Sequence, residues 1–500
     1  MMWNNIYKIQ IHTCWGGEIV GLLEEQSTVN EVSDQDANGT KEIAPFFIES
    51  ISFVGFLAAV AILILIVLYI NWLLRMPYVS VGLTVAPTAA CLGMCLVIIK
   101  CTCVLEKYWG LTQTSLANGH PWRAYLGIAM FFTMFTAIML SAIWSKYNDN
   151  SLVNALMEFY GGSQSDPYYF GGNIDIPHYF NIARFGYVNE GTALDYNIVF
   201  FPMYPLLLYI GFIIYPNFVI VGMTISTIAS VGSCAILYKL ERERCGHEEG
   251  IRTVKYLVLF PMAYYLFTPM SESLFLLLSL SVFYCLTHRQ YILLFIFALC
   301  AGLTRSIGIV ITVPILIEAG RILFFERDKI TAVKTAICAC APLLSLSIYM
   351  LINYIVFGNP LIFLEIQQTH WSQSISFFWN TAHYLTEYSY NYIQSGDIGS
   401  LMGYSGSGVV SLAMALALII VGSKRLPPTY TAYATAYFVM GFGATWLLSG
   451  PRYTLCLFPI AMSMSWLTRN KWVDRILTGI YVTWLIIYTH YYITGVWDIY

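Results

Sequence analysis

The sequence predicts an all-α protein that crosses a membrane many times. Of its 500 residues, 58% are hydrophobic and only 11% are charged, and the mean hydropathy is +0.65. Because about a quarter of the residues in soluble globular proteins are charged, this composition excludes that class. The net charge of -3 comes without any basic tract, which argues against binding of nucleic acid.

The lengths of the apolar runs give the number of spans. A helix needs about 20 apolar residues to cross a bilayer, and on that basis we expect about thirteen transmembrane helices, several of them short. Residues 198–213 are apolar but carry Pro202 and Pro205. We interpret them as a juxtamembrane or re-entrant segment, because a full span there would disturb the alternation of sides along the chain. The expected spans cover 48–73, 79–99, 124–145, 216–238, 252–268, 271–287, 291–304, 306–324, 331–357, 404–422, 429–447, 452–467 and 474–493.

The spans divide the chain into three parts. Residues 1–45 are polar and acidic and lack the basic start and apolar core of a signal peptide, so we expect a cytosolic tail. Residues 46–123 would form two extra N-terminal spans, and residues 124–495 the main transmembrane domain. The twelve cysteines are found mainly within or beside apolar runs, which indicates small core residues rather than disulfides or a zinc site.

Basic residues predict the orientation of the chain. Lys and Arg gather in the loops at 239–255, 289, 321–329, 424–425 and 469–475, and this bias marks the cytosolic side. The loops and turns between the basic loops then face the non-cytosolic side of the membrane. They are the outer loops 146–215 and 358–403 and the turns at 268–273, 304–306 and 450–453. An ionised side chain at membrane depth costs roughly 2.5–3.5 kcal/mol, so charges in these turns are expected to have a partner or a function.

The stretch 173–205 is the strongest candidate for a functional site. A short helix is expected there, with Asp175 as its N-cap, Pro177 in its first turn and Gly186 after its end. A spacing of three residues places Asp175 and His178 on one side of this helix. The simpler alternative is that Asp175 only caps the helix and His178 only lies at an interface.

Other polar residues on the same side also have simpler explanations. Glu272 fits the first turn of a helix that begins near 271, where an acid complements the helix dipole. Arg305 and Arg452 lie at helix junctions, where their side chains would reach lipid headgroups. Trp371 fits an interfacial aromatic belt. Their joint location on one side favours a common site.

Several motifs occur in an order that resembles a known family. The runs IDIPHYFNIARFGY and YNIVFFPMYPLL are similar to the motif of the PIG-V family of mannosyltransferases and their prokaryotic relatives. Further similarities follow in SESLF, GLTRSIGIV, GNPLIFLEIQQTHW and GPRYTLCLFPI, so the resemblance covers residues 125–470. Two features depart from the family: Ile174 stands where its members have Trp, and the first 120 residues have no counterpart.

The resemblance implies a GT-C glycosyltransferase fold and a sugar transfer on the non-cytosolic face. The donor would be a polyprenyl phosphate sugar such as dolichyl-phosphate mannose, and the acceptor a lipid-linked glycan such as a GPI precursor, with inversion at the transferred sugar. Such chemistry needs a carboxylate base and positive charge for the departing phosphate. We assign Asp175 as the base, Arg305 and Arg452 to the donor phosphate, and His178, Glu272, Arg184, Tyr204 and Trp371 to orientation of the sugar or acceptor, with Phe200 and Phe201 beside them.

The sequence leaves several alternatives open. No ligand spacing demands a metal, although a divalent cation on His178 and Glu272 stays open, as does the need for an accessory membrane subunit. The protein would lie in the plasma membrane if prokaryotic and in the endoplasmic reticulum membrane if eukaryotic. Among enzymes, the alternative is a prokaryotic transferase that acts on a cell-envelope lipid, polymer or protein. A transporter and a non-catalytic subunit are the alternatives of other classes, but the internal repeats common in transporters are not seen.

Overall fold

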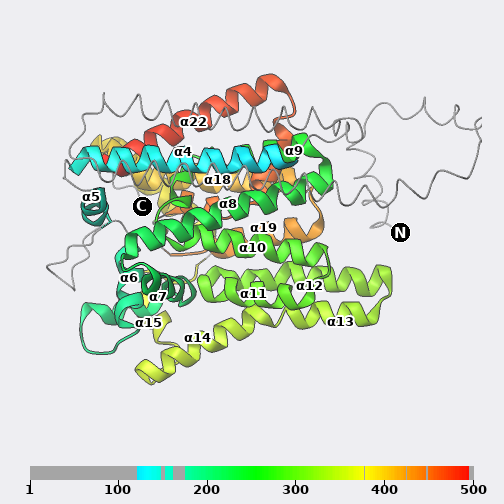
Figure 1. Ribbon diagram of the computed structural model, residues 1–500, viewed down its shortest axis with the longest axis horizontal. Coiled ribbons are helices and arrows are strands. Elements are labelled where there is room, and N and C mark those ends of the chain that lie inside the picture. The colour runs from blue at the N-terminus through cyan, green and yellow to red at the C-terminus, as the bar shows by residue number, and fades with distance from the viewer. Residues whose placement is uncertain are drawn as a thin grey trace, which may run out of the picture. The chain divides into compact units, whose positions relative to one another are not determined.

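The computed structural model describes residues 121–147, 152–160 and 175–494, apart from the single positions 377, 424, 446 and 448. The chain divides into two compact units, residues 1–130 and 131–500, and the account below concerns the second. The described residues are almost entirely helical (Figure 1), and the one β pairing among them is an isolated bridge between Ile375 and Ala444. The α-helices are α4 (Pro121–Tyr147), α5 (Leu152–Phe159), α6 (Ile176–Phe185), α7 (Met203–Ile214), α8 (Phe218–Cys245), α9 (His247–Val258), α10 (Ser271–Thr287), α11 (Tyr291–Thr304), α12 (Thr312–Arg321), α13 (Lys329–Cys338), α14 (Ala341–Phe357), α15 (Ile362–Thr369), α16 (Phe378–Ser395), α17 (Ile398–Ser400), α18 (Gly406–Ser423), α19 (Pro428–Gly441), α20 (Gly450–Leu455), α21 (Pro459–Leu467) and α22 (Lys471–Thr494).

Long apolar helices confirm that this is an all-α membrane protein. Within the described residues, six helices are long and apolar enough to cross a membrane, and α10 and α11 are shorter apolar helices. The predicted tail 1–45 and the predicted spans 48–73 and 79–99 lie outside the described residues. The six long helices are Arg123–Ser145, Phe218–Cys245, Ser306–Glu326, Lys329–Phe357, Ile398–Ser423 and Lys471–Thr494.

Three of the predicted spans are not continuous helices, and one of them, 429–447, stops early because α19 ends at Gly441. In the segment 252–268, α9 ends at Val258 and a short 3₁₀ turn, η2 (Ala263–Leu266), follows. In the segment 452–467, the chain is interrupted between α20 and α21. Pro261 and Pro459 lie at these breaks, and proline lacks the N–H that would continue a helix.

The segment predicted to be re-entrant is sharply bent. A 3₁₀ helix, η1 (Ala193–Val199), precedes α7, and the two are inclined by 115° across a break of a few residues. Pro202 lies directly before α7. This geometry fits either a broken span or a re-entrant loop, and it rules out one straight helix across 198–213.

The basic loops lie together at one end of the helices. Glu243 meets His288 at 3.3 Å, and Arg289 bonds to Glu326 at 2.6 Å, so three successive basic loops are in contact. Arg244 donates a hydrogen bond to the carbonyl oxygen of Arg425 at 3.4 Å. The grouping of these loops on a single side therefore agrees with the contacts, and we call this the basic end.

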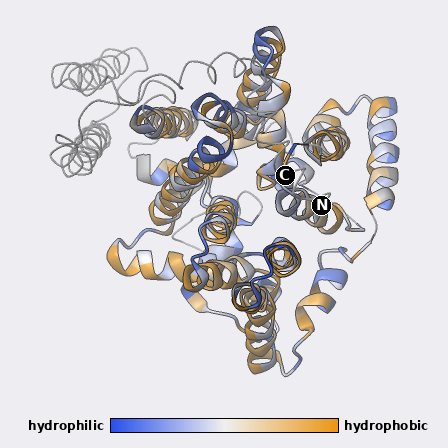
Figure 2. Ribbon diagram, turned by 90° about the vertical axis from the view of Figure 1, so that its right-hand side faces the viewer, coloured by the Kyte–Doolittle hydropathy of each residue, from blue (hydrophilic) through white to orange (hydrophobic). Residues whose placement is uncertain are grey.

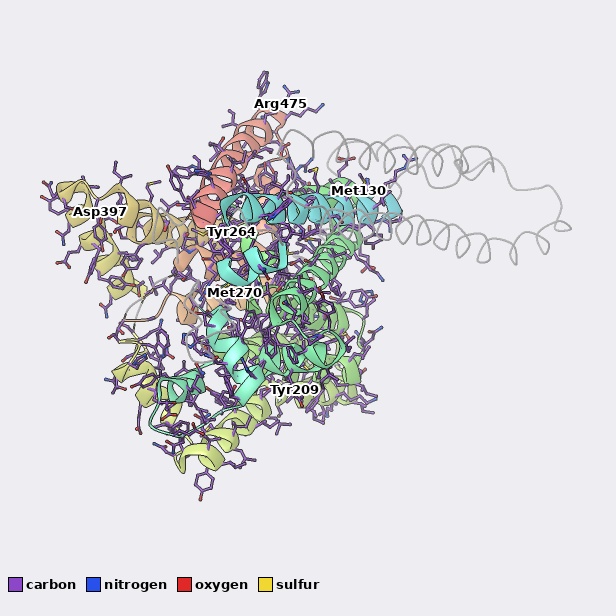
Figure 3. The ribbon with its side chains drawn as sticks, turned by 60° about the vertical axis from the view of Figure 1, so that its left-hand side comes forward. Met130, Tyr209, Tyr264, Met270, Asp397 and Arg475 are labelled. Atoms are coloured by element: carbon purple, nitrogen blue, oxygen red, sulfur yellow. The ribbon has the colours of Figure 1, made fainter. Side chains whose placement is uncertain are left out.

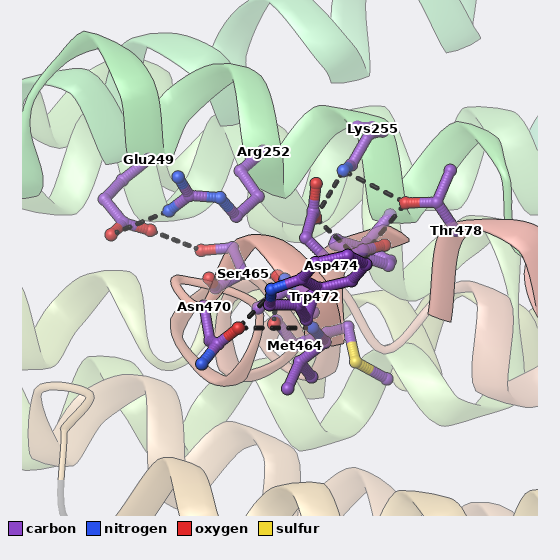
Figure 4. Close-up of polar contacts among 12 residues, drawn as sticks. Glu249, Arg252, Lys255, Met464, Ser465, Asn470, Trp472, Asp474 and Thr478 are labelled. Carbon is purple, nitrogen blue, oxygen red and sulfur yellow. Dashed lines mark hydrogen bonds and ion pairs between the residues drawn. The ribbon is translucent and has the colours of Figure 1, made fainter. Parts of the chain in front are cut away.

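Ion pairs also join the basic loop at 469–475 to α9 (Figure 4). Lys255 bonds to Asp474 at 2.5 Å and to Thr478 at 3.1 Å. Glu249 accepts bonds from Ser465 at 2.9 Å and from Arg469 at 2.5 Å. These contacts fix the start of α22 and the end of α21 against α9.

The core consists of closely packed helices that run side by side. Helices α8, α10 and α11 pack in sequence, and α14 packs on α11. Gly222 lies against Pro269, and a Cβ built at Gly302 would be 2.5 Å from the hydroxyl oxygen of Ser345, so the backbones approach closely at both points. Many outward-facing turns are apolar (Figure 2), as expected for surfaces that face lipid.

Candidate functional site

Four charged side chains, from four separate segments of the chain, lie in contact at the ends of the helices. Asp175 precedes α6, Glu272 lies in the first turn of α10, Arg305 stands between α11 and the 3₁₀ helix η3 (Ser306–Ile311), and Arg452 is on α20. Arg452 bonds to Asp175 at 2.9 Å, and its Nε lies 3.2 Å from Glu272. Arg305 bonds to the same Glu272 oxygen at 2.5 Å. We call these four residues the ion cluster.

The ion cluster lies at the opposite end of the helices from the basic loops. Helix α10 has Glu272 at its start and ends before His288, and its 17 residues span about 25 Å. Helix α11 runs the other way, from the basic loop at Arg289 to Arg305. The two charged side chains therefore meet because two short antiparallel helices end at the same level.

Asp175 occupies the predicted N-cap position, but its carboxylate does not cap the helix. The structure gives it no side-chain bond to the backbone of α6, and the carboxylate bonds instead to Arg452. Pro177 in the first turn and Gly186, with a φ of 74°, begin and end the helix as predicted. The interpretation of Asp175 as only a helix cap is therefore wrong.

Burial distinguishes Asp175 from its partners. The Glu272 side chain is fully buried and those of Arg452 and Arg305 are 5% and 10% exposed, whereas the Asp175 side chain is 18% exposed. Oε2 of Glu272 and Nη1 of Arg452 are buried and have no hydrogen-bond partner among the described residues. Two carboxylates and two guanidiniums leave no net formal charge, so the cluster is balanced yet keeps unsatisfied polar atoms.

Neutral hydroxyl groups form a hydrogen-bonded chain to Arg305. Nη1 of Arg305 donates to the Ser271 hydroxyl at 3.0 Å, and the Tyr179 hydroxyl lies 2.8 Å from the same oxygen. Tyr264 and Met270, labelled in Figure 3, come from the segment that leads into α10 and are fully buried. The sequence reasoning missed Tyr179 and Ser271, although the helix that carries Asp175 and the SESLF run were the available signals.

A second group of side chains lies one helical turn from Asp175. The His178 ring stacks on Phe200 at 4.6 Å and meets the edge of Trp371 at 5.3 Å. Its Nδ1 lies 2.7 Å from Oδ1, the side-chain amide oxygen of Asn197, and because this oxygen only accepts, Nδ1 is the donor. Burial lowers the pKa of His178 below its usual 6.5. The neutral ring therefore keeps Nε2 as an acceptor.

The indole of Trp371 has an unused donor. Its Nε1 is buried and has no hydrogen-bond partner among the described residues. The neighbouring His370 ring stacks on Tyr196 at 3.6 Å, which holds this segment against η1. We call His178, Asn197, Phe200 and Trp371 the aromatic group; Asn197 is a member that the sequence reasoning did not single out.

Three of the predicted side chains do not reach the site. Tyr204 is fully buried, and its hydroxyl is 3.4 Å from Ser226 on α8, so it packs helices together. Phe201 is buried against Tyr349 at 4.1 Å. Arg184 is exposed in the last turn of α6, at the far end of that helix from Asp175.

No group of three or more His, Cys, Asp or Glu side chains that could hold a metal ion is found in the described part of the chain. Comparison of the chain with protein-family models, with curated proteins and with solved structures finds no match in any of the three. The family assignment therefore stays a prediction from the ordered motifs.

Proposed function

We propose that this protein is a membrane glycosyltransferase that moves a sugar from a polyprenyl phosphate carrier to a lipid-linked acceptor. From the motif order, we further propose a GT-C fold with about thirteen spans, mannose as the sugar and an acceptor of the GPI-precursor type. The reaction would take place on the non-cytosolic face, because the ion cluster is at the end opposite the basic loops.

The observation that carries the proposal is a partly exposed carboxylate beside two buried guanidiniums. Asp175 is the most exposed member of the ion cluster and the one that an acceptor hydroxyl can reach. Nη1 of Arg452 has no hydrogen-bond partner among the described residues, and guanidinium pairs well with phosphate. The proposed base, Asp175, is therefore in direct contact with a proposed phosphate-binding residue, Arg452.

The chemical step uses these groups in defined roles. The acceptor hydroxyl gives its proton to Asp175 as its oxygen attacks the anomeric carbon from the face opposite the phosphate. The bond between that carbon and the phosphate oxygen breaks, and the electron pair leaves with the phosphate. Arg452 and Arg305 stabilise the charge that develops there, while Glu272 holds both guanidiniums in place.

The aromatic group provides surfaces for a sugar. Nε2 of His178 would accept a hydrogen bond from a sugar hydroxyl, and Nε1 of Trp371 would donate one to a hydroxyl or phosphate oxygen. Because His178 follows Asp175 by one turn of α6, both would face the same bound sugar. We keep the role of sugar or acceptor orientation for His178 and Trp371 and withdraw it for Arg184 and Tyr204.

The test is sugar transfer by the purified chain in lipid vesicles. Polyprenyl-phosphate mannose labelled in the sugar is compared with nucleotide-linked mannose and with polyprenyl-phosphate glucose, against GPI precursors and cell-envelope lipids. We expect label in a lipid acceptor only from a polyprenyl phosphate donor, and glucose transfer in place of mannose would change the sugar but keep the reaction class.

Two outcomes would overturn the proposal. One is label that crosses the vesicle membrane without covalent transfer, which would indicate a transporter. The other is no transfer from any polyprenyl phosphate donor with any acceptor in vesicles where the chain is shown to be folded. Asp397→Asn serves as a matched control, because Asp397 caps α17 in the predicted outer loop 358–403, and Figure 3 shows it well apart from Met270, which lies two residues before Glu272.

A further inference from the structure

We propose that the groove between α11 and α13 is a binding site for one anionic phospholipid of the membrane leaflet at the basic end. The site is independent of the ion cluster and of the proposed sugar transfer. The lipid phosphate would pair with Lys334, and an acyl chain would lie in the groove.

The groove is almost wholly apolar. It has a volume of about 350 Å³, within the range of small-molecule sites. Its walls are side chains of α11 and α13, which lie side by side (Figure 1), and the thiol of Cys338 bonds to the Tyr291 carbonyl oxygen at 3.4 Å between them. The lining residues are Tyr291, Ile292, Phe295, Ile296, Lys334, Ile337 and Cys338.

The groove lies at the basic end, far from the ion cluster. Tyr291 begins α11, whereas Arg305 follows the last residue of that helix, so about 20 Å of helix separates the two. Lys334 is in the second turn of α13, close to the loop that contains Arg327. The lipid in question therefore belongs to the other leaflet from the one that the ion cluster faces.

Charge complementarity identifies the occupant. Lys334 is exposed, and no carboxylate of the described chain pairs with its amine. Lys334 lines the groove, and a lysine stem can lie along an apolar wall with its amine at the rim, where a headgroup phosphate would be. Exposed apolar side chains beside it, such as Ile292 at 79% and Ile337 at 57% exposure, match an acyl chain. Basic pockets between membrane helices on the cytoplasmic side suit anionic headgroups.

The test uses lipid binding to the full chain, measured by native mass spectrometry. The purified protein is titrated with equal amounts of palmitoyl-oleoyl phosphatidylglycerol and phosphatidylcholine, which share their acyl chains and differ in headgroup charge. One basic contact at the surface gives a preference of roughly fivefold for the anionic lipid. We expect this preference for the first bound lipid of the wild type.

Three variants separate the site from general surface charge. Lys334→Gln removes the amine and is expected to abolish the preference. Ile337→Trp fills the groove without a change of charge and is expected to weaken binding of both lipids. Lys471→Gln removes an exposed lysine that also lies at the basic end but does not line the groove, and it should behave as wild type.

The proposal is overturned by an equal effect of Lys334→Gln and Lys471→Gln, which would indicate diffuse charge. It is also overturned if the wild type binds both lipids alike. Melting curves and size-exclusion profiles of all three variants show whether each is folded. If Lys334→Gln does not fold, Ile337→Trp still tests the groove.

Discussion

Substitution of Glu272 tests the central role that the ion cluster gives to this carboxylate. Glu272 is fully buried, and a single oxygen of it contacts Arg305 at 2.5 Å and Arg452 at 3.2 Å. Glu272→Gln keeps the size of the side chain but leaves two buried guanidiniums with Asp175 as their only carboxylate in the cluster. Loss of one partner of a buried ion pair costs about 3–5 kcal/mol, so we expect the free energy of unfolding to fall by that amount.

The measurement is equilibrium unfolding by denaturant in lipid micelles, with a surface pair as control. Glu243 is 41% exposed and pairs with His288, so Glu243→Gln should cost less than about 1 kcal/mol. A double variant that also carries Arg305→Gln should lose less than the sum of the single losses, because the guanidinium left unpaired by the first change is gone. A Glu272→Gln protein within about 1 kcal/mol of wild type would refute the reasoning.

Three further predictions follow from the same contacts. Burial lowers the pKa of His178, so as the pH falls the imidazole is protonated in the unfolded chain before it is protonated in the folded one. The free energy of unfolding should therefore fall as the pH drops through 6.5. His178→Gln keeps a polar group near Asn197 and should remove this pH dependence in urea titrations between pH 7.5 and 5. Trp371→Phe should leave the melting temperature nearly unchanged, since Nε1 has no protein partner, yet raise the acceptor KM severalfold in a transfer assay; an unchanged KM would contradict its placement in the site. Asp474→Asn should destabilise the protein by only about 1 kcal/mol, because Lys255 and Asp474 are both partly exposed, and a loss above about 3 kcal/mol in the same urea titrations would be inconsistent with that.

The sequence predicted in part that the four residues of the ion cluster come together. Apolar runs and basic loops place Asp175, Glu272, Arg305 and Arg452 on one side of a membrane without any coordinates. The pairing was not predictable, because span order gives the side on which a residue lies and not its distance from another. For this reason the sequence allowed Asp175 to be a cap, whereas the structure has it bonded to Arg452.

Residue type alone misplaced three of the predicted side chains, Arg184, Tyr204 and Phe201. An arginine or tyrosine near a motif suits both a binding role and a packing role, and only the fold reveals which applies. Arg184 lies at the wrong end of α6, and Tyr204 is enclosed between helices. Conversely, Asn197 has no distinctive sequence signal, since its role depends on the turn of η1 that brings it to His178.

The helix count shows a further limit of apolar length as a guide. Long uninterrupted runs such as the one in α8 became long helices, as predicted. Runs that contain proline, at Pro261 and Pro459, broke into shorter pieces whose ends need not reach a membrane surface. A similar break before α7 contributes to the site, because it positions Phe200 beside His178.

The most direct test of the central claim is the turnover number for sugar transfer, measured for wild type and Asp175→Asn side by side in the same vesicles. The substitution keeps the size of the side chain and removes the base. We predict a loss of roughly 10²–10⁴-fold in turnover with little change in the donor KM, the range expected for a general base. Equal turnover in the two proteins would contradict the assignment of Asp175 as the group that accepts the proton.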